Sequence, residues 1–260
     1  MENLNQYPLK IVLIGSGNVA TSMAHALRGK ADIVQIFSPR LNHAQQLATA
    51  VGCTQATDDL AQLRNDADVY IISVVDDAIA DIINATPDNG ALWVHTSGSK
   101  PIDVFAGHRR RCGVLYPMQS FSRNLVADFT PVHVFIEANN PTTLADVQAL
   151  ACLLSQHVTE ADSEVRCRLH VAAVFACNFA NLQWTLANEV LNEAGLPFSS
   201  MLPLIRNSVD KLTHLPPADS QTGPAARGDM DVLSKHLGLL SGDKRDIYQL
   251  LSQSIINRRK

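Results

Sequence analysis

Residues 9–20 read LKIVLIGSGNVA, and this stretch decides the fold. A short apolar run leads into G-x-G-x-x-A and then into a helical pattern, which is the order of a dinucleotide-binding βαβ unit. Gly15 allows a sharp turn off the strand, Gly17 lets backbone approach a pyrophosphate, and Ala20 lets the helix pack tightly on the strand. The alternative is a glycine-rich turn in some other parallel sheet. The residues assigned to the cofactor phosphates are Gly15, Ser16, Gly17, Asn18 and Val19.

The end of the second expected strand predicts which dinucleotide binds. Residues 33–37 end about 20 residues beyond the glycines, where an NAD-binding fold carries Asp or Glu for the ribose 2′-hydroxyl. The chain has Ser38 and Arg40 there, a hydroxyl and a guanidinium that suit a 2′-phosphate. The sequence therefore favours NADP over NAD. The alternative is that Arg40 only begins a solvated helix.

Length and composition indicate a globular enzyme of two domains. The chain has 260 residues, of which 46% are hydrophobic, so it exceeds one Rossmann domain and can fill two cores. A net charge of −4 argues against a nucleic-acid-binding protein. The basic runs at residues 109–111 and 258–260 are interpreted as solvated surface and a frayed tail.

No segment predicts association with a membrane. No apolar run reaches the roughly 18 residues of a membrane span, and the polar N-terminus lacks a signal-peptide core. The five cysteines form no CxxC pair, so they are interpreted as reduced, mostly buried thiols, and no metal site is expected. These features predict a cytoplasmic protein.

The sequence pattern changes near residue 160. Before that point apolar runs alternate with helical patterns, which predicts an α/β doubly wound parallel sheet of the Rossmann type with extra strands at its far edge. The pattern after it predicts an all-α domain. The expected helices cover residues 163–194, 199–212, 230–240 and 244–257. We predict an NADP-binding Rossmann domain over residues 1–160 and a helical domain over residues 161–260.

Several segments together resemble a known bacterial family. They are IGSGNVA, IFSPR, IISVVDDAI, VHTSG, YPMQSF and, most distinctively, TGPAARGD. Over nearly its whole length the chain resembles a family of NADP oxidoreductases with a Rossmann-like domain and a C-terminal domain of unknown function. It is more distantly similar to pyrroline-5-carboxylate reductases, 6-phosphogluconate-type dehydrogenases and deazaflavin-dependent NADP oxidoreductases. In those relatives the helical domain dimerises and helps to build the substrate cleft, so the resemblance implies NADP as cofactor and a homodimer.

The run SVVDD follows a buried strand, at the edge where open sheets bind ligands. The resemblance implies that Val74 and Val75 lie along the nicotinamide ribose through their backbone. The adjacent carboxylates, Asp76 and Asp77, could serve acid–base chemistry. We interpret them instead as caps of the helix that begins at Ala78.

The loop after the next strand, HTSGS, resembles the substrate loop of the 6-phosphogluconate-type enzymes. Its hydroxyls and small residues can offer several donors to a substrate carboxylate or phosphate. The candidate substrate-binding residues are Thr96, Ser97 and Gly98. In the alternative, this is an ordinary strand-to-helix loop in which Ser99 caps a short helix. His95 is interpreted as a hydrogen-bonded residue at the sheet end rather than as a proton donor.

Polar residues on the first long helix of the second domain are further candidates. His170 and Asn181 are eleven residues apart and so nearly on one helical face, and Asn178 lies one turn before Asn181. The stretch is very apolar, so these polar residues need partners if they are buried. We expect His170 and Asn178, together with Ser97, to be catalytic residues that orient the substrate or supply a proton, or alternatively to form hydrogen bonds between helices. The hydroxyacid dehydrogenases carry a catalytic lysine on this helix. Val174 stands at that position, so the lysine is not carried over.

The segment TGPAARGD, residues 222–229, is a loop of small residues before a helix. Its backbone N–H groups and Arg227 suit a small anionic substrate. In the alternative, Arg227 pairs with Asp229 to brace the turn, and Gly228 supplies an unusual dihedral angle.

These features together predict an NADP(H)-dependent oxidoreductase that transfers a hydride to or from a small polar, anionic C=O or C=N compound. Hydride transfer belongs to the cofactor, so the part of the protein is binding and orientation. The absent lysine motivates one alternative, a non-catalytic NADP-binding sensor or scaffold. A second alternative is a deazaflavin-dependent NADP reductase.

Overall fold

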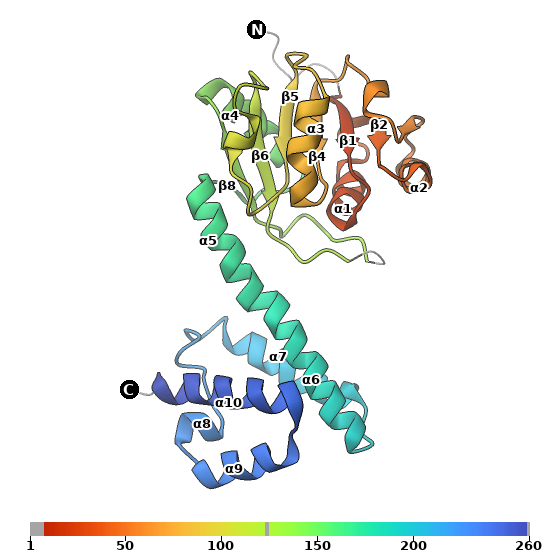
Figure 1. Cartoon of the computed structure of the whole chain (residues 1–260). Coiled ribbons are helices and arrows are strands. Elements are labelled where there is room, and N and C mark those ends of the chain that lie inside the picture. Colours follow the sequence, from red (N-terminus) through yellow and green to blue (C-terminus); the bar gives the residue numbers. More distant parts are fainter. Residues whose placement is uncertain (1–7, 123–124, 259–260) are drawn as a thin grey trace. The chain divides into compact units, whose positions relative to one another are not determined.

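The computed structural model describes residues 8–122 and 125–258. The chain divides into two compact units, Met1–Cys177 and Asn178–Lys260. The first unit is built on a β-sheet, and the described part of the second unit consists of helices (Figure 1). This confirms the predicted fold class, an α/β part of the Rossmann type followed by an all-α part.

The described residues of the first unit form one sheet of eight strands. These are β1 (Lys10–Ile14), β2 (Asp32–Phe37), β3 (Ala56–Thr57), β4 (Val69–Ile72), β5 (Leu92–His95), β6 (Cys112–Pro117), β7 (Val134–Ala138) and β8 (Val158–Glu160). Their order across the sheet is β3-β2-β1-β4-β5-β6-β7-β8. Neighbouring strands are parallel except for β6 and β7, which are antiparallel. The order reverses between β1 and β4, which is the switch point of a doubly wound sheet.

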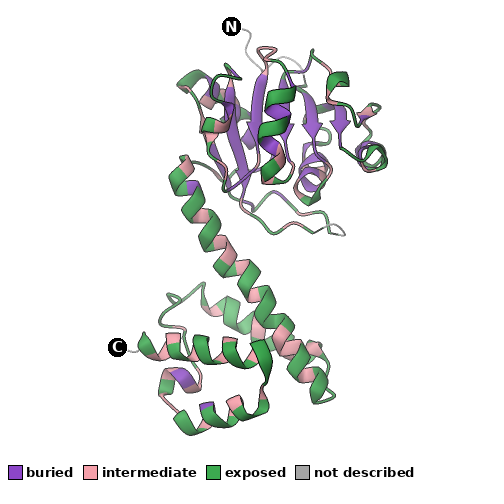
Figure 2. Cartoon of the chain, in the orientation of Figure 1, coloured by how far each residue is buried: buried purple, intermediate pink, exposed green. Residues whose placement is uncertain are grey.

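Helices cover both faces of this sheet. They are α1 (Asn18–Leu27), α2 (Leu41–Val51), α3 (Ile79–Ala85) and α4 (Pro141–Cys152), with 3₁₀ turns η1 (Leu60–Gln62), η2 (Asp76–Ala78) and η3 (Ile102–Phe105). Alternate residues of β1 serve opposite faces, since Ile11 and Leu13 pack with α1, α2 and α4 whereas Val12 and Ile14 pack with α3. Figure 2 shows the buried residues concentrated in the strands.

Arg109 is not part of a solvated surface, and that prediction was wrong. Its side chain is buried, and its guanidinium lies 4.2 Å from the centre of the Trp93 ring. The same guanidinium donates to the backbone oxygens of Ile83 and Thr86 at 3.2 and 3.0 Å. The aromatic face and the carbonyls at the end of α3 together satisfy a charge that the sequence alone assigns to solvent.

The first unit ends in a helix that changes its hydrogen-bond pattern. α5 (Ser163–Ala173) begins after the N-cap Asp162, whose carboxylate accepts from a backbone N–H of the first turn at 2.8 Å. A π-helical turn, η4 (Val174–Phe179), follows instead of the uninterrupted α-helix that the sequence predicts. Hydrogen bonds in a π-turn run from i to i+5, so the α-helical period does not hold across it. Residue spacing therefore does not assign His170 and Asn178 to one helical face.

The second unit has very little core of its own. Among its described residues only Ala225 and Leu233 are buried. Its helices are α6 (Ala180–Glu193), α7 (Leu202–Lys211), α8 (Pro224–Arg227), α9 (Met230–Leu239) and α10 (Gly242–Asn257), with the 3₁₀ turn η5 (Phe198–Met201) before α7. Single helices of this kind normally bury one face, and here those faces are largely exposed.

Three expectations from the composition can be compared with the described residues. No helix among them combines the length and the hydropathy that crossing a lipid bilayer requires. No group of three or more His, Cys, Asp or Glu among them is arranged to hold a metal ion. The five cysteines are free thiols, but only Cys112 is buried. The expectation of mostly buried thiols was wrong because Cys152 and Cys167 are exposed on helices α4 and α5.

Candidate functional site

The turn after β1 accepts only glycine at its first position. Gly15 has a φ of +126°, and a Cβ placed there would lie 2.0 Å from the backbone oxygen of Ser73. Its N–H donates to the backbone oxygen of Phe37 at 2.8 Å. The left-handed conformation and the contact with the loop after β4 explain why the chain turns sharply at this residue.

Gly17 stands beside open space. A Cβ placed there would meet no atom within 4 Å, although the residue is the N-cap of α1. The N-cap is a glycine, and among the residues described no side chain accepts a hydrogen bond from the N–H groups of the first turn of α1. Free N–H groups, the positive end of the helix dipole and room for a bulky anion together fit the pyrophosphate of a dinucleotide.

Two serines join this turn to the end of β2. Ser38 is buried, and its hydroxyl oxygen accepts from the hydroxyl of Ser16 at 2.8 Å. The backbone N–H of Arg40 also points to Ser38 Oγ, at 3.4 Å. The Arg40 side chain is exposed and has no hydrogen bond or ion pair with the part of the chain described. Its guanidinium is therefore available to an anion beside the two serines.

The loop after β4 faces the loop after β5. Asp76 and Asp77 lie in η2 and cap no helix, so the predicted capping role was wrong. The Asp76 carboxylate accepts from the hydroxyl of Ser99, and Asp77 Oδ1 lies 3.7 Å from Lys100 Nζ. The carboxylates of Asp76 and Asp77 therefore connect the loop after β4 to the loop after β5. Val75 is 74% exposed at the same edge.

Ser97 organises the loop after β5 through its side chain. Its hydroxyl oxygen accepts from the backbone N–H groups of Ser99 and Lys100 at 3.1 and 3.0 Å. η3 begins after Pro101 and has no side-chain cap, so the alternative in which Ser99 caps a helix was wrong. The local ring of hydrogen bonds competes with capping because short hydroxyl side chains readily bond to nearby backbone.

His95 lies fully buried at the end of β5. Its Nδ1 accepts from the backbone N–H of Ser97 at 3.2 Å, and its ring stacks on Phe105 at 5.6 Å. Burial lowers the pKa of His95 to about 4, and the charge of Arg166 acts in the same direction. The imidazole is therefore neutral near pH 7, in agreement with its interpretation as a structural residue.

Gly98, Tyr116 and His170 meet at this edge of the sheet. A Cβ on Gly98 would lie 2.7 Å from Tyr116 Cζ and 2.9 Å from His170 Nδ1, so only glycine permits this packing. The Tyr116 hydroxyl lies 3.2 Å from His170 Nδ1. Burial raises the pKa of Tyr116, and the charge of Arg166 opposes that rise. The structure thus brings two predicted residues together with a tyrosine that the sequence analysis did not single out.

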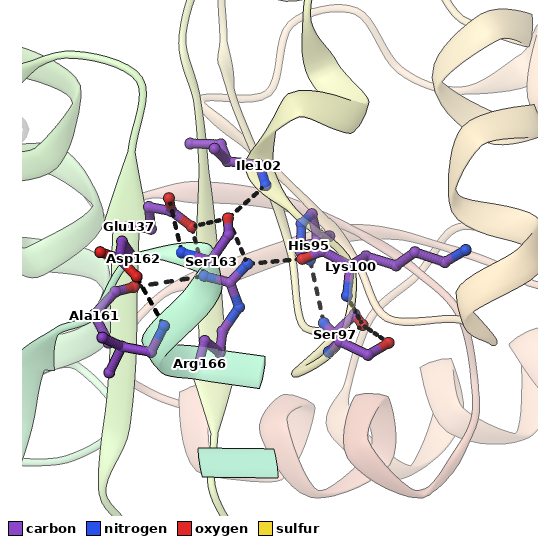
Figure 3. Close-up of polar contacts among 11 residues, drawn as sticks. His95, Ser97, Lys100, Ile102, Glu137, Ala161, Asp162, Ser163 and Arg166 are labelled. Atoms are coloured by element: carbon purple, nitrogen blue, oxygen red, sulfur yellow. Dashed lines mark hydrogen bonds and ion pairs between the residues drawn. The ribbon is translucent and has the colours of Figure 1, made fainter. Parts of the chain in front are cut away.

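Arg166 fixes α5 against the sheet and the loop after β5 (Figure 3). This side chain is 1% exposed and forms an ion pair with Glu137 on β7. Its Nη2 donates to the backbone oxygen of Lys100 at 2.7 Å. Ser163 completes the cluster, because its hydroxyl donates to Glu137 at 2.8 Å and accepts from the N–H of Ile102 at 3.1 Å. His170 lies one helical turn after Arg166 and so on the same face of α5.

A chain of contacts along the carboxyl ends of the strands connects the glycine-rich turn after β1 with the cluster of Gly98, Tyr116 and His170. Gly15 lies against Ser73, and the Ser73 hydroxyl oxygen accepts from the hydroxyl of Thr96 at 3.2 Å. Thr96 begins the loop that carries Gly98 to His170. The edge is therefore continuous from the glycine-rich turn to the Tyr116–His170 contact.

Two predicted site residues lie in the second unit. Asn178 is exposed. Arg227 donates to Asp229 at 2.9 Å through Nε and forms an ion pair of 2.8 Å through Nη2. Gly228 has a φ of +81° and ends α8. The interactions of the turn-bracing alternative are therefore present in the structure.

Two known domain models match most of this chain. A domain described as "NADP oxidoreductase coenzyme F420-dependent" matches residues 10–96, and a domain of unknown function (DUF2520) matches residues 132–255. A sequence search of curated proteins finds no match.

Solved structures extend the comparison to nearly the whole chain. The crystal structure of putative NADP oxidoreductase BF3122 from Bacteroides fragilis is 43% identical, with a TM-score of 0.90 over 96% of this chain and 99% of that chain. Protein TM1727 from Thermotoga maritima is 22% identical, with a TM-score of 0.69 over 95% and 97% of the two chains. A reductive aminase from Aspergillus terreus, in complex with NADPH and ethyl-5-oxohexanoate, is 12% identical, with a TM-score of 0.72 over 97% and 96%.

The fold and the glycine-rich turn define a dinucleotide-dependent oxidoreductase with a helical C-terminal part. The chain belongs to the family of NADP oxidoreductases in which this N-terminal domain is followed by DUF2520. The two more distant structures share the fold.

Proposed function

We propose that this enzyme transfers a hydride between NADP(H) and a small polar, anionic compound that carries a C=O or C=N bond. The observation that carries the proposal is the continuous edge from Gly15 and Gly17 to the cluster of Gly98, Tyr116 and His170. Open α/β sheets bind ligands at the carboxyl ends of their strands, so a cofactor at one end of this edge brings its reactive ring toward the other.

The residues proposed for the cofactor divide by the group that they bind. The free N–H groups around Gly17 take the pyrophosphate, and Ser38 with Arg40 takes the 2′-phosphate. Val74 and Val75 border the nicotinamide ribose. When bound, NADPH supplies the hydride, and the protein binds and orients both reactants.

The substrate class rests on the chemistry of the loop after β5. Thr96, Ser97 and Ser99 supply closely spaced hydroxyls, of which that of Ser99 donates to Asp76, and Lys100 adds a positive charge 3.7 Å from Asp77. Such a loop suits a carboxylate or phosphate next to the reacting bond. The reductive aminase of the same fold was solved with a keto ester, which agrees with a C=O or C=N substrate.

An assay of NADPH consumption tests the proposal. The probes are glyoxylate, pyruvate and 1-pyrroline-5-carboxylate, with ethyl pyruvate as the uncharged match to pyruvate. We expect at least one anionic probe to consume NADPH with one equivalent of reduced product, and ethyl pyruvate to react more slowly than pyruvate. Binding of NADPH without consumption by any probe supports the sensor alternative. Consumption with oxidised coenzyme F420 alone supports the deazaflavin alternative.

A homodimer through the second unit is also proposed. Leu239 and Leu250 are 79% and 70% exposed, and helices α6, α9 and α10 line an apolar cavity of about 530 Å³. A helical unit with only two buried residues in its described part lacks a core, and a second copy of the same unit supplies one. Light scattering at micromolar concentration should give twice the 28.3 kDa of one chain, and Leu239→Glu should shift the mass toward 28.3 kDa. A native mass of 28.3 kDa excludes the dimer.

A further inference from the structure

Tyr116 and His170 form a hydrogen bond between two titratable side chains at 3.2 Å. β6 is parallel to β5, so Tyr116 reaches the same edge as the loop that carries Gly98. The Tyr116 ring is buried and packs beside Phe135, with a ring distance of 6.5 Å. Its hydroxyl end meets His170, whose side chain is exposed. The pair therefore joins a fixed, buried phenol to solvent.

We infer that Tyr116 is the catalytic acid of the reduction and that His170 returns the proton to it from solvent. The inference rests on the proposed function, because an acid is needed only if the protein reduces a C=O or C=N bond. Gly98 is essential to the arrangement, since any side chain there would displace both rings.

The surroundings of Tyr116 favour the protonated phenol in the resting enzyme and allow a transient phenolate during the reaction. Burial raises the pKa of Tyr116, so the hydroxyl is protonated near pH 7. Arg166 is the charged group that acts on the phenol, and it is already paired with Glu137. Its positive charge stabilises a phenolate that forms for a short time. His170 is the titratable group in direct contact.

Each proton in the step has an origin and a destination. The substrate carbon accepts the hydride with its electron pair from NADPH, and the substrate oxygen or nitrogen accepts the proton of the Tyr116 O–H bond. The phenolate then takes the Nδ1 proton of His170, while Nε2 of the same ring takes a proton from water, and proton exchange of the exposed imidazole with solvent restores the Nδ1–H tautomer. The imidazole stays neutral, and the reduction consumes one proton from solvent for each hydride transferred.

The pair is not required to hold α5 on the sheet. Arg166 and Ser163 already attach the first turn of that helix to Glu137, Lys100 and Ile102. A hydrogen bond between two titratable side chains, one turn further along and at the exposed edge, adds little to that attachment. A role in proton transfer gives a reason for this hydrogen bond at the carboxyl ends of the strands.

Tyr116→Phe tests the acid directly. With the probe that the native enzyme reduces fastest, we expect kcat to fall about 100-fold or more, whereas KM stays within threefold and the NADPH dissociation constant within twofold. Tyr70→Phe is the matched control. It removes a hydroxyl from another buried tyrosine of the same sheet, which bonds to the Arg64 backbone oxygen at 2.5 Å, and should leave kcat within twofold.

His170→Ala tests the positioning and relay role. We expect kcat to fall about tenfold and to recover when imidazole is added, which a merely structural histidine would not show. Added imidazole should not restore Tyr116→Phe. In the native enzyme kcat/KM should fall only above the ordinary tyrosine value of about pH 10, because burial raises the pKa of Tyr116. That alkaline fall should be absent in Tyr116→Phe.

The outcomes separate the inference from the proposed function. Native turnover together with a Tyr116→Phe kcat within threefold of native overturns the inference and leaves the proposed function standing. NADPH binding without turnover of any probe overturns the proposed function and the inference with it. Loss of activity in His170→Ala without recovery in imidazole overturns the relay role of His170.

Discussion

Replacement of Arg166 with alanine is expected to destabilise the first unit by about 3–5 kcal/mol. The guanidinium is 1% exposed, and its partner Glu137 is 15% exposed, so the substitution leaves a carboxylate with little access to water and no counter-charge. It also removes the donor to the Lys100 backbone oxygen. Removing one member of a buried ion pair costs far more than the pair contributes, because the remaining charge cannot be resolvated.

Urea unfolding followed by tryptophan fluorescence measures this loss. The chain has two tryptophans, and a Trp184→Phe background leaves Trp93 on β5 as the reporter of the first unit. Arg168→Ala is the matched control on the same helix. Arg168 pairs with Glu164, both are about four-fifths exposed, and the expected loss is below about 1 kcal/mol.

A second variant separates the lost charge balance from the lost packing. Arg166→Met combined with Glu137→Gln removes both charges and keeps a side-chain oxygen for Ser163. This double variant should recover at least half of the stability lost in Arg166→Ala. A loss below about 1 kcal/mol in Arg166→Ala, equal to that of Arg168→Ala, contradicts the assigned role.

The sequence predicted those parts of the fold that local patterns determine. The glycine-rich turn was recognised because Gly15 needs a positive φ and Ala20 must be small. Both requirements restrict the residue type and can therefore be read from the sequence. The all-α second part followed from helical periodicity in the same way. The antiparallel pairing of β6 and β7 was not predicted, since the direction of a strand depends on the connection that leads to it rather than on its composition.

The side chains that were missed depend on partners distant in the sequence. Arg109 and Arg166 look solvated on their own segments, but Trp93 and Glu137 make their burial favourable. Tyr116 looks like an ordinary core residue of a strand, and only the approach of α5 shows that its hydroxyl meets His170. The segment YPMQSF, singled out by resemblance, was the one signal that could have indicated it.

The predicted helix-capping roles of the aspartates and of Ser99 were also wrong because of partners distant in the sequence. Asp76 and Ser99 each precede a helical turn, which is the local signature of an N-cap. In the structure the two side chains bond to each other across neighbouring loops. A local propensity of about 1 kcal/mol is easily exceeded when sheet topology brings a better partner close.

Arg40→Ala is expected to weaken NADPH binding by about 1.5–3 kcal/mol, which is roughly 10- to 150-fold. The reason is that the exposed guanidinium has no partner in the described chain and belongs to a residue whose backbone N–H points to Ser38, so we propose that it binds the 2′-phosphate. NADH lacks that phosphate, so its affinity should change less than twofold.

Gly17→Ala provides the matched comparison within the same cofactor site. A Cβ at Gly17 meets no protein atom within 4 Å, so the variant should fold with native stability. The added methyl group occupies the space assigned to the pyrophosphate, which both cofactors contain. NADPH and NADH should therefore weaken by similar factors, in contrast to the selective loss in Arg40→Ala.

The dissociation constants of NADPH and NADH for the native protein, measured by cofactor fluorescence titration, test the central claim most directly. We expect NADPH to bind at least about tenfold more tightly than NADH, and Arg40→Ala to bring the two values together. Equal affinities for the two cofactors in the native protein would contradict the assignment of the 2′-phosphate to Ser38 and Arg40 and, with it, NADP(H) as the cofactor of this site.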